Sequence, residues 1–183
     1  MCAGVIDMIG FGLTCIVSFA LGQGHDLPVA DSMKGIAFLV GDWTGKQDFV
    51  TGGDPLVGDV TAHIHEAIGG RYIEESLAVT LPGRKPSDTR HFMTYDSKAG
   101  KFKAWWFNDS SVGAMELEGS VQGNKLVLES KPTQTGAGTG TIFRATYESP
   151  GPNALTYGLE IKAGDNWMSL FKTTYKRAEA RSK

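Results

Sequence analysis

The sequence predicts an all-β protein, an antiparallel up-and-down β-barrel of about ten strands preceded by one short helix. Runs rich in β-branched and aromatic residues follow one another along the chain, and Gly, Pro, Asn or Asp ends each run at the spacing typical of barrels and sandwiches. Most of the 24 glycines lie between these runs, where tight turns require positive φ. Within the runs, apolar and polar residues alternate, which is typical of strands with one buried face.

Composition and charge limit the possible classes of protein. A chain of 183 residues fits one domain with a real core. Its 41% hydrophobic and 21% charged residues are ordinary for a globular protein, and they exclude a disordered chain or a multi-span membrane protein. The 18 Lys and Arg against 20 Asp and Glu leave a net charge of -2, so we expect no nucleic-acid partner.

The first 22 residues resemble an export signal. Residues 8–22 form an uncharged apolar run that is too short to span a membrane and ends in Ala20-Leu21-Gly22, a small-x-small pattern. We predict a signal peptide over residues 1–22, a periplasmic or secreted protein and no stable membrane span after cleavage. Residues 1–7 lack the usual Lys or Arg, so a buried helix or an uncleaved anchor stays an alternative. Cys2 and Cys15 both lie in this leader, so the mature chain has neither a thiol nor a disulfide.

Residues 23–40 form the predicted N-terminal extension, and residues 41–178 form the barrel domain. In the extension, Asp31-Ser32 reads as an N-cap, Met33 and Ile36 as apolar helix positions, and Gly41 as a stop. The ten expected strands are 42–50, 58–68, 71–81, 90–96, 101–108, 113–121, 125–130, 141–148, 154–162 and 166–177. Short turns at 69–70, 97–100, 122–124 and 163–165 predict antiparallel neighbours. Pairing of the first strand with the last removes both sheet edges.

Alternation assigns the two faces of the expected strands. In the last strand the inward set is Trp167, Ser169, Phe171, Thr173 and Tyr175, because Lys172 and Lys176 take the other side. The fifth strand carries apolar residues on both faces. Its outward Trp105 and Phe107 predict an outer aromatic patch.

The first strand opens on Gly41-Asp42-Trp43-Thr44-Gly45, which resembles the Gly-x-Trp signature of lipocalins and related calycins. This resemblance implies a calycin-like barrel in which Trp43 closes one end and Arg177 of the last strand stacks on it. Residues 69–73, 93–96 and 103–106 resemble the exported bacterial proteins of domain-of-unknown-function family 1579. That resemblance covers nearly the whole mature chain, and it implies a fold and no particular activity.

The opening motif is also similar to that of the haem-binding nitrobindins, in which a His near the last strands holds the iron. Residues 154–183 of this chain contain no His. We therefore expect no haem of that kind and no other cofactor. His63 and His65 share one strand face, about 7 Å apart, as two metal ligands could. Because Val60, Ala62 and Ile64 form the buried set, both imidazoles are expected in solvent and no metal site is predicted.

The candidate ligand-binding residues are the polar and aromatic side chains that alternation directs inward. A few polar groups in an apolar interior are typical of a drug-sized pocket, so we expect a small apolar or amphipathic molecule as partner. Alternatively, these groups satisfy one another or water. The candidates are Glu66, Glu75, His91, Tyr95, Trp106, Asn108, Tyr157 and Phe171.

Two other functions stay open. The barrel could be an enzyme that uses His91, Glu66 or Glu75 as acid or base, because Glu66 and Glu75 are expected close together across the 69–70 hairpin and such a pair shifts a carboxyl pKa. It could instead be an interaction module that uses the outer aromatic patch. No known catalytic motif appears in the sequence, so no residue is assigned a catalytic role, and the chain is expected to be a monomer or a homodimer.

Overall fold

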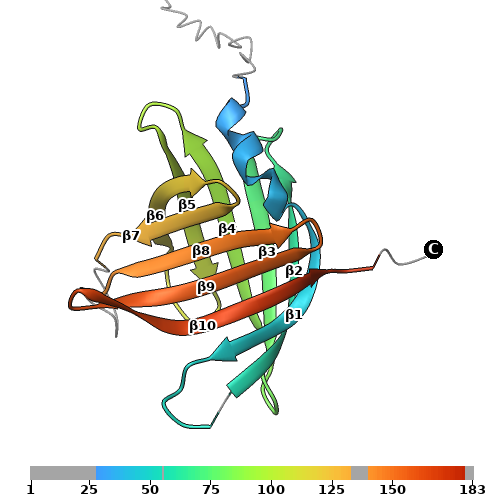
Figure 1. Cartoon of the computed structure of the whole chain (residues 1–183), viewed down its shortest axis with the longest axis vertical. Helices are drawn as coiled ribbons and strands as arrows, with labels where there is room; N and C mark the ends of the chain where they lie inside the picture. Colours follow the sequence, from blue (N-terminus) through green and yellow to red (C-terminus); the bar gives the residue numbers. More distant parts are fainter. Residues whose placement is uncertain (1–27, 55, 133–139, 180–183) are drawn as a thin grey trace, which may run out of the picture.

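The structure is a computed structural model that describes residues 28–54, 56–132 and 140–179. The predicted signal peptide, with its cleavage site and both cysteines, lies outside the described residues. The described chain contains one helix and ten strands (Figure 1). These are η1 (Asp31–Leu39), β1 (Gly41–Phe49), β2 (Leu56–Ala67), β3 (Tyr72–Thr80), β4 (Ser87–Asp96), β5 (Lys101–Asn108), β6 (Met115–Gln122), β7 (Lys125–Ser130), β8 (Phe143–Gly151), β9 (Ala154–Ala163) and β10 (Asn166–Arg177).

The ten strands form one closed antiparallel barrel in which each strand pairs with its neighbours in sequence. β1 pairs with β2 on one side and with β10 on the other, with Trp43 opposite Arg177 and Phe49 opposite Phe171. The predicted fold class and the pairing of the first strand with the last are therefore confirmed. Closure leaves no free sheet edge among these ten strands, and an unpaired edge would invite aggregation.

The helix η1 closes one end of the barrel, which we call the helix end. It is a 3₁₀ helix that begins at Asp31, and its N-cap is Ala30 without a side-chain hydrogen bond, so the predicted Asp31-Ser32 cap was wrong. Met33, Ile36 and Leu39 are buried, because the tighter helix brings side chains three residues apart onto the face that packs on the core. In Figure 1 the helix lies across the strand ends.

Trp43 and Arg177 pack against each other at the helix end, where β1 pairs with β10. The guanidinium of Arg177 lies 4.3 Å from the ring centroid of Trp43, the contact that the sequence predicts. The indole Nε1 donates a hydrogen bond of 2.8 Å to the carbonyl of Leu39, which ties the strand to η1. Gly41 has a φ of 149°, which other residues rarely adopt, and a Cβ at this position would displace the Arg177 guanidinium from Trp43.

A β-bulge in β10 corrects the predicted face of its first residues. The register against β9 shifts between Ser169 and Phe171, so one extra residue reverses the alternation. Trp167 and Ser169 therefore lie on the outer face, and the guanidinium of Arg144 sits 3.7 Å from the Trp167 ring centroid. Beyond the bulge the predicted inward positions are buried, namely Phe171, Thr173 and Tyr175.

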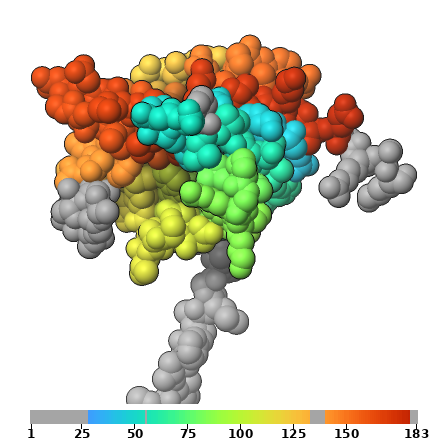
Figure 2. Space-filling view, turned by 90° about the horizontal axis from the view of Figure 1, so that it is seen from below, coloured from blue at the N-terminus to red at the C-terminus, as the bar shows by residue number. Residues whose placement is uncertain are grey.

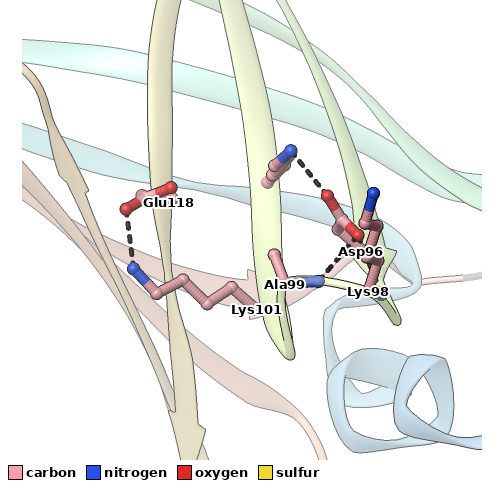
Figure 3. Close-up of polar contacts among 6 residues, drawn as sticks. Asp96, Lys98, Ala99, Lys101 and Glu118 are labelled. Atoms are coloured by element: carbon pink, nitrogen blue, oxygen red, sulfur yellow. Dashed lines mark hydrogen bonds and ion pairs between the residues drawn. The ribbon is translucent and has the colours of Figure 1, made fainter.

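Surface ion pairs fix the hairpin between β4 and β5 at the helix end (Figure 3). Asp96 accepts hydrogen bonds of 3.0 Å from the backbone amides of Lys98 and Ala99, which shape the turn. The hydrogen bond from Lys103 lowers the pKa of the Asp96 carboxyl, and the hydrogen bond from the Ala99 amide lowers it further. Lys101 pairs with Glu118 of β6 at 2.7 Å (Figure 3). These exposed pairs hold strand register more than they add stability.

The opposite end of the barrel carries the connections that follow β1, β3, β5 and β9, and we call it the loop end. Figure 2 shows this end, with the green connection between β3 and β4 projecting from it. Between the two ends the inward side chains form a single buried cluster. Among the described residues, no helix is both long and apolar enough to cross a membrane.

Candidate ligand-binding site

A row of three inward side chains crosses β3, β4 and β5 in the middle of the barrel. Glu75 is the register partner of His91, and His91 is the register partner of Trp106. Each occupies an inward position because its strand alternates between the two faces. Glu75 is 0% exposed and His91 5%, which is rare for ionisable side chains unless they are paired.

Glu75, His91 and Tyr147 form a buried triangle of short contacts. Nδ1 of His91 lies 2.6 Å from Oε2 of Glu75, and the Tyr147 hydroxyl donates to the same oxygen at 2.6 Å. The third side, from Nδ1 to the Tyr147 oxygen, is 2.7 Å. Because a carboxylate only accepts, this network assigns the hydrogen of a neutral His91 ring to Nδ1 and leaves Nε2 as an acceptor.

Aromatic rings surround the triangle. Tyr147 stacks on Tyr157 with ring centroids 4.4 Å apart and an interplanar angle of 14°. Tyr157 meets Phe171 edge-on at 5.4 Å and His91 at 5.9 Å, while the Trp106 ring meets His91 edge-on at 5.1 Å. These contacts fix the orientation of the imidazole.

Three buried tyrosines surround the carboxylate. Burial raises the pKa of Tyr147 well above its ordinary value, and the negative charge of Glu75 raises it further. The pKa values of Tyr157 and Tyr175 are raised well above the ordinary value by the same two causes, with burial again the larger. These phenols therefore stay protonated and remain available as hydrogen-bond donors.

Several polar atoms of this cluster have no hydrogen-bond partner among the described residues. Buried polar groups are nearly always paired, and elsewhere in this interior Thr173 donates to Gln47 at 2.9 Å. The unpaired atoms of the cluster are Oε1 of Glu75, Nε2 of His91, Nε1 of Trp106, and the hydroxyls of Tyr157 and Tyr175. Five such atoms therefore lie on neighbouring side chains of one cluster.

A small space lies among these side chains, and its accessible lining is apolar. It measures about 10 Å³, about the size that one water molecule needs. It is lined by His91, Met93, Ala104, Trp105, Trp106, Leu117, Leu128, Ala145, Tyr147 and Tyr157. A drug-sized pocket occupies several hundred Å³, so this space is far smaller than the pocket expected from the sequence. Buried side chains of the described strands fill the barrel around it.

The structure brings together five of the eight candidate residues and separates the other three. Glu75, His91, Trp106, Tyr157 and Phe171 are in mutual contact through the pairs given above.

The other three candidates lie at the two ends of the barrel. Glu66 is exposed beside Gly70 at the helix end, opposite Ile73, so it forms no carboxylate pair with the buried Glu75. Tyr95 packs edge-on against Phe102, also toward the helix end. The Asn108 side chain accepts hydrogen bonds from Ser110 at the loop end.

Tyr147 and Tyr175 belong to the cluster, although sequence reasoning did not name them as site residues. Both occupy inward positions of β8 and β10, which alternation assigns correctly. Tyr147 and Glu75, which share a hydrogen bond, lie 72 residues apart in the chain. Alternation marks both tyrosines as inward polar residues, but the sequence does not say which inward polar residues meet.

The outer face near β1 and β2 holds the paired histidines. His63 contacts Asp42 and stacks on His65 at 4.9 Å, so both imidazoles point outward as expected. A broad groove of about 810 Å³ runs past His63 and Arg90, but Asp42 and His63 are more than half exposed there. Within the described ranges, no group of three or more His, Cys, Asp or Glu side chains is placed to hold a metal ion.

The outer aromatic patch is also present, on β3, β4 and β5. Tyr72 and Trp105 lie 6.4 Å apart, and Phe92 meets Phe107 edge-on at 6.2 Å. The rings cover one another, and Phe107 is the most exposed of the apolar side chains here at 42%.

Fold and cluster together define the class: a closed ten-stranded antiparallel barrel, capped by one short helix, with a buried Glu–His–Tyr cluster at its centre. The chain belongs to the family described as protein of unknown function DUF1579, which it matches over residues 32–177. The match spans the helix and all ten strands. Curated proteins give no significant match to the sequence.

Similarity to a solved structure supports the fold. Rv2717c from M. tuberculosis is similar at a TM-score of 0.62 and 16% identity, and the alignment covers 83% of this chain and 100% of that protein. A protein of unknown function from the DUF3598 family of Nostoc punctiforme aligns over 82% of this chain and 100% of its own, at 7% identity and a TM-score of 0.23. At these identities the first similarity supports the barrel fold alone, and the second carries no argument.

Proposed function

We propose that the barrel binds a small apolar or amphipathic molecule, with the polar end of that molecule on the Glu75–His91–Tyr147 cluster. The observation that carries the proposal is the group of buried polar atoms without partners beside a small enclosed space. Each such atom costs about 1–3 kcal/mol when it stays unpaired. A bound polar group removes that cost, whereas packing alone does not explain why it is tolerated.

The loop end supplies the apolar contacts for the rest of the ligand. Four partly buried side chains pack on the core at this end: Phe49, Met115, Phe143 and Leu170. Because the enclosed space has room for only one small group, the ligand body must displace some of these side chains. Met115 is suited to this movement, since unbranched Met side chains adapt their shape readily.

Filling the interior tests the proposal. Ala145 lines the space, and Ala145→Leu adds bulk there, while Thr146→Leu adds similar bulk at the next, outward position. We expect Ala145→Leu to weaken binding of the neutral fluorescent probe N-phenyl-1-naphthylamine at least tenfold, because the leucine occupies the site. Thr146→Leu is expected to bind the probe like the unmodified protein.

Two results would contradict the interior site. Unchanged probe affinity in Ala145→Leu would place the probe elsewhere on the molecule. Equal weakening in both variants would point to a general loss of structure, which circular dichroism and urea unfolding of each variant reveal.

A second candidate function is proton-transfer catalysis on the same cluster. Glu75 orients the His91 ring through Nδ1 at 2.6 Å and leaves Nε2 without a partner among the described residues, as a general base requires. Of the three bases considered from the sequence, Glu66 lies outside this arrangement. Low water content at the cluster would strengthen the electrostatic effect of each group.

Glu75→Gln separates binding from chemistry. This change keeps the side-chain shape and removes the charge that orients His91. If the barrel is an enzyme, the variant is expected to keep its ligand and to lose exchange of ligand hydrogen for solvent deuterium, which mass spectrometry of the co-purified ligand measures. If both proteins show the same slow exchange, catalysis by this dyad is excluded.

A further inference from the structure

We propose that the loop end of the barrel docks on the surface of a lipid bilayer. Seven large apolar side chains are exposed among the described residues, and five of them lie at this end. Single exposed apolar residues are ordinary on a protein surface, but their concentration at one end indicates an interaction surface. The five are Val50, Val57, Phe107, Val112 and Met168, whereas Val29 and Ile68 lie at the helix end.

The exposed side chains lie on separate connections around the loop end. Val50 follows β1, Val112 lies between β5 and β6, and Met168 is near the start of β10. All three are more than half exposed. A protein interface needs a contiguous buried core, whereas a fluid bilayer interface accepts apolar side chains one by one. This arrangement therefore fits a lipid surface better than a protein partner.

The connection between β3 and β4 adds positive charge at the same end. Arg84 and Lys85 are exposed on it, and this connection projects from the molecule in Figure 2. Neither side chain has an ion-pair partner among the described residues, so both are available to lipid phosphates. Asp54, Asp109 and Asp165 lie in neighbouring connections, so the attraction to anionic lipid is modest. The apolar side chains therefore contribute most of the binding.

The choice of a bilayer also rests on the proposed function. A small apolar or amphipathic ligand partitions into membranes, and the loop end supplies its apolar contacts through Phe49, Met115, Phe143 and Leu170. Docking by this end brings those side chains close to the lipid, so the ligand passes between bilayer and interior with little exposure to water. The bilayer is thus the source or the destination of the ligand.

Flotation of the protein with vesicles tests the docking surface. We expect the unmodified protein to float with vesicles of equimolar phosphatidylcholine and phosphatidylglycerol, and less strongly with phosphatidylcholine alone. Val50→Asp with Val112→Asp removes two apolar contacts and is expected to weaken binding about tenfold. The matched control is Val29→Asp with Ile68→Asp, which adds the same charge at the helix end and should bind like the unmodified protein. All four side chains are exposed, so these changes leave the core intact.

A second pair of variants tests the contribution of charge. Arg84→Gln with Lys85→Gln is expected to weaken binding to the mixed vesicles about fivefold, because basic side chains are attracted to an anionic surface. Binding to phosphatidylcholine alone should stay unchanged. The matched control, Lys34→Gln with Lys98→Gln, removes the same charge at the helix end and should leave both measurements unchanged.

Three outcomes would overturn the docking surface. They are failure of the unmodified protein to float with either vesicle, equal weakening in the loop-end and helix-end variants, and self-association that only the loop-end variant abolishes, which would mark an interface between two copies. Failure of the proposed function is distinguishable, because vesicle binding is measured without an interior ligand. Ala145→Leu is expected to lose the fluorescent probe and still float normally. Normal flotation of an unmodified protein that binds no probe would overturn the interior site alone.

Discussion

At the scale of single residues, one carboxylate organises the interior. Glu75 is fully buried, and its charge is compensated by the hydrogen of His91 Nδ1 and by the Tyr147 hydroxyl. A buried charge is tolerated only when it is hydrogen-bonded in this way. The same carboxylate orients the His91 ring through Nδ1.

Tyr147 and Tyr175 should differ in their contribution to stability. Tyr147→Phe removes the hydrogen bond to charged Glu75 and is expected to lower the free energy of unfolding by about 2 kcal/mol. Tyr175→Phe is the control, because its hydroxyl has no partner among the described residues, and a change below about 1 kcal/mol is expected. Urea unfolding measures both. Equal losses would show that the Glu75 contact is not the main contribution.

At the scale of elements, turns and one bulge decide what each strand presents to the interior. The turn between β2 and β3 contains three successive residues with positive φ, namely Ile68 at 50°, Gly69 at 64° and Gly70 at 79°. The glycines accept this conformation, but a β-branched residue does so only with strain. Ile68 is also 65% exposed, so its side chain contributes little packing in return.

Relief of this strain should stabilise the protein. Ile68→Asn places a residue that tolerates the left-handed region, and we expect the free energy of unfolding to rise by about 1 kcal/mol. Val112→Asn is the matched control, since Val112 is fully exposed and lacks positive φ. Thermal and urea unfolding compare the two variants. No gain in Ile68→Asn would show that the native turn carries no such strain.

At the scale of the whole molecule, closure of the barrel joins strands from both ends of the domain around one core. β1 and β10 meet through Trp43 and Arg177, and the cluster draws on β3, β4, β5, β8, β9 and β10. Local opening of one strand therefore exposes the shared core, so we expect the barrel to unfold cooperatively.

Alkaline unfolding should report this cooperativity. The folded state raises the pKa values of three buried phenols, Tyr147, Tyr157 and Tyr175. These groups therefore contribute their full stabilisation below the unfolded phenol pKa of about 10. The stabilisation is lost as the pH rises above that value, because only the unfolded phenols then ionise. Three such groups lower the free energy of unfolding by up to about 4 kcal/mol per pH unit.

Absorbance of phenolate at 295 nm and far-ultraviolet circular dichroism, followed together against pH, measure this loss. The three buried phenols are expected to ionise only in step with loss of the barrel. Their ionisation while the dichroism stays native would contradict the burial of the cluster. The triple change to Phe at these positions is the control, and it should remove the corresponding absorbance change.

Much of the fold could be predicted from particular residues. Glycine-rich turns and two-residue alternation place ten strands, and the Gly41–Gly45 motif with Arg177 indicates closure. The prediction failed where a local pattern has two solutions. The bulge after Ser169 has no clear sequence signal, yet it places Trp167 on the opposite face from the one predicted. The reason is that pairing with β9, and not the sequence of β10 alone, sets the register.

The sequence by itself determined the number of strands, their antiparallel order and the inward set that includes Glu75, His91 and Tyr157, because alternation and turn chemistry act over a few residues. Only the tertiary structure decided that Tyr147 meets Glu75, that Glu66 stays in solvent, and that the space beside the cluster measures about 10 Å³. Those outcomes depend on barrel curvature and on side-chain volumes brought together from distant strands, and no local pattern records them.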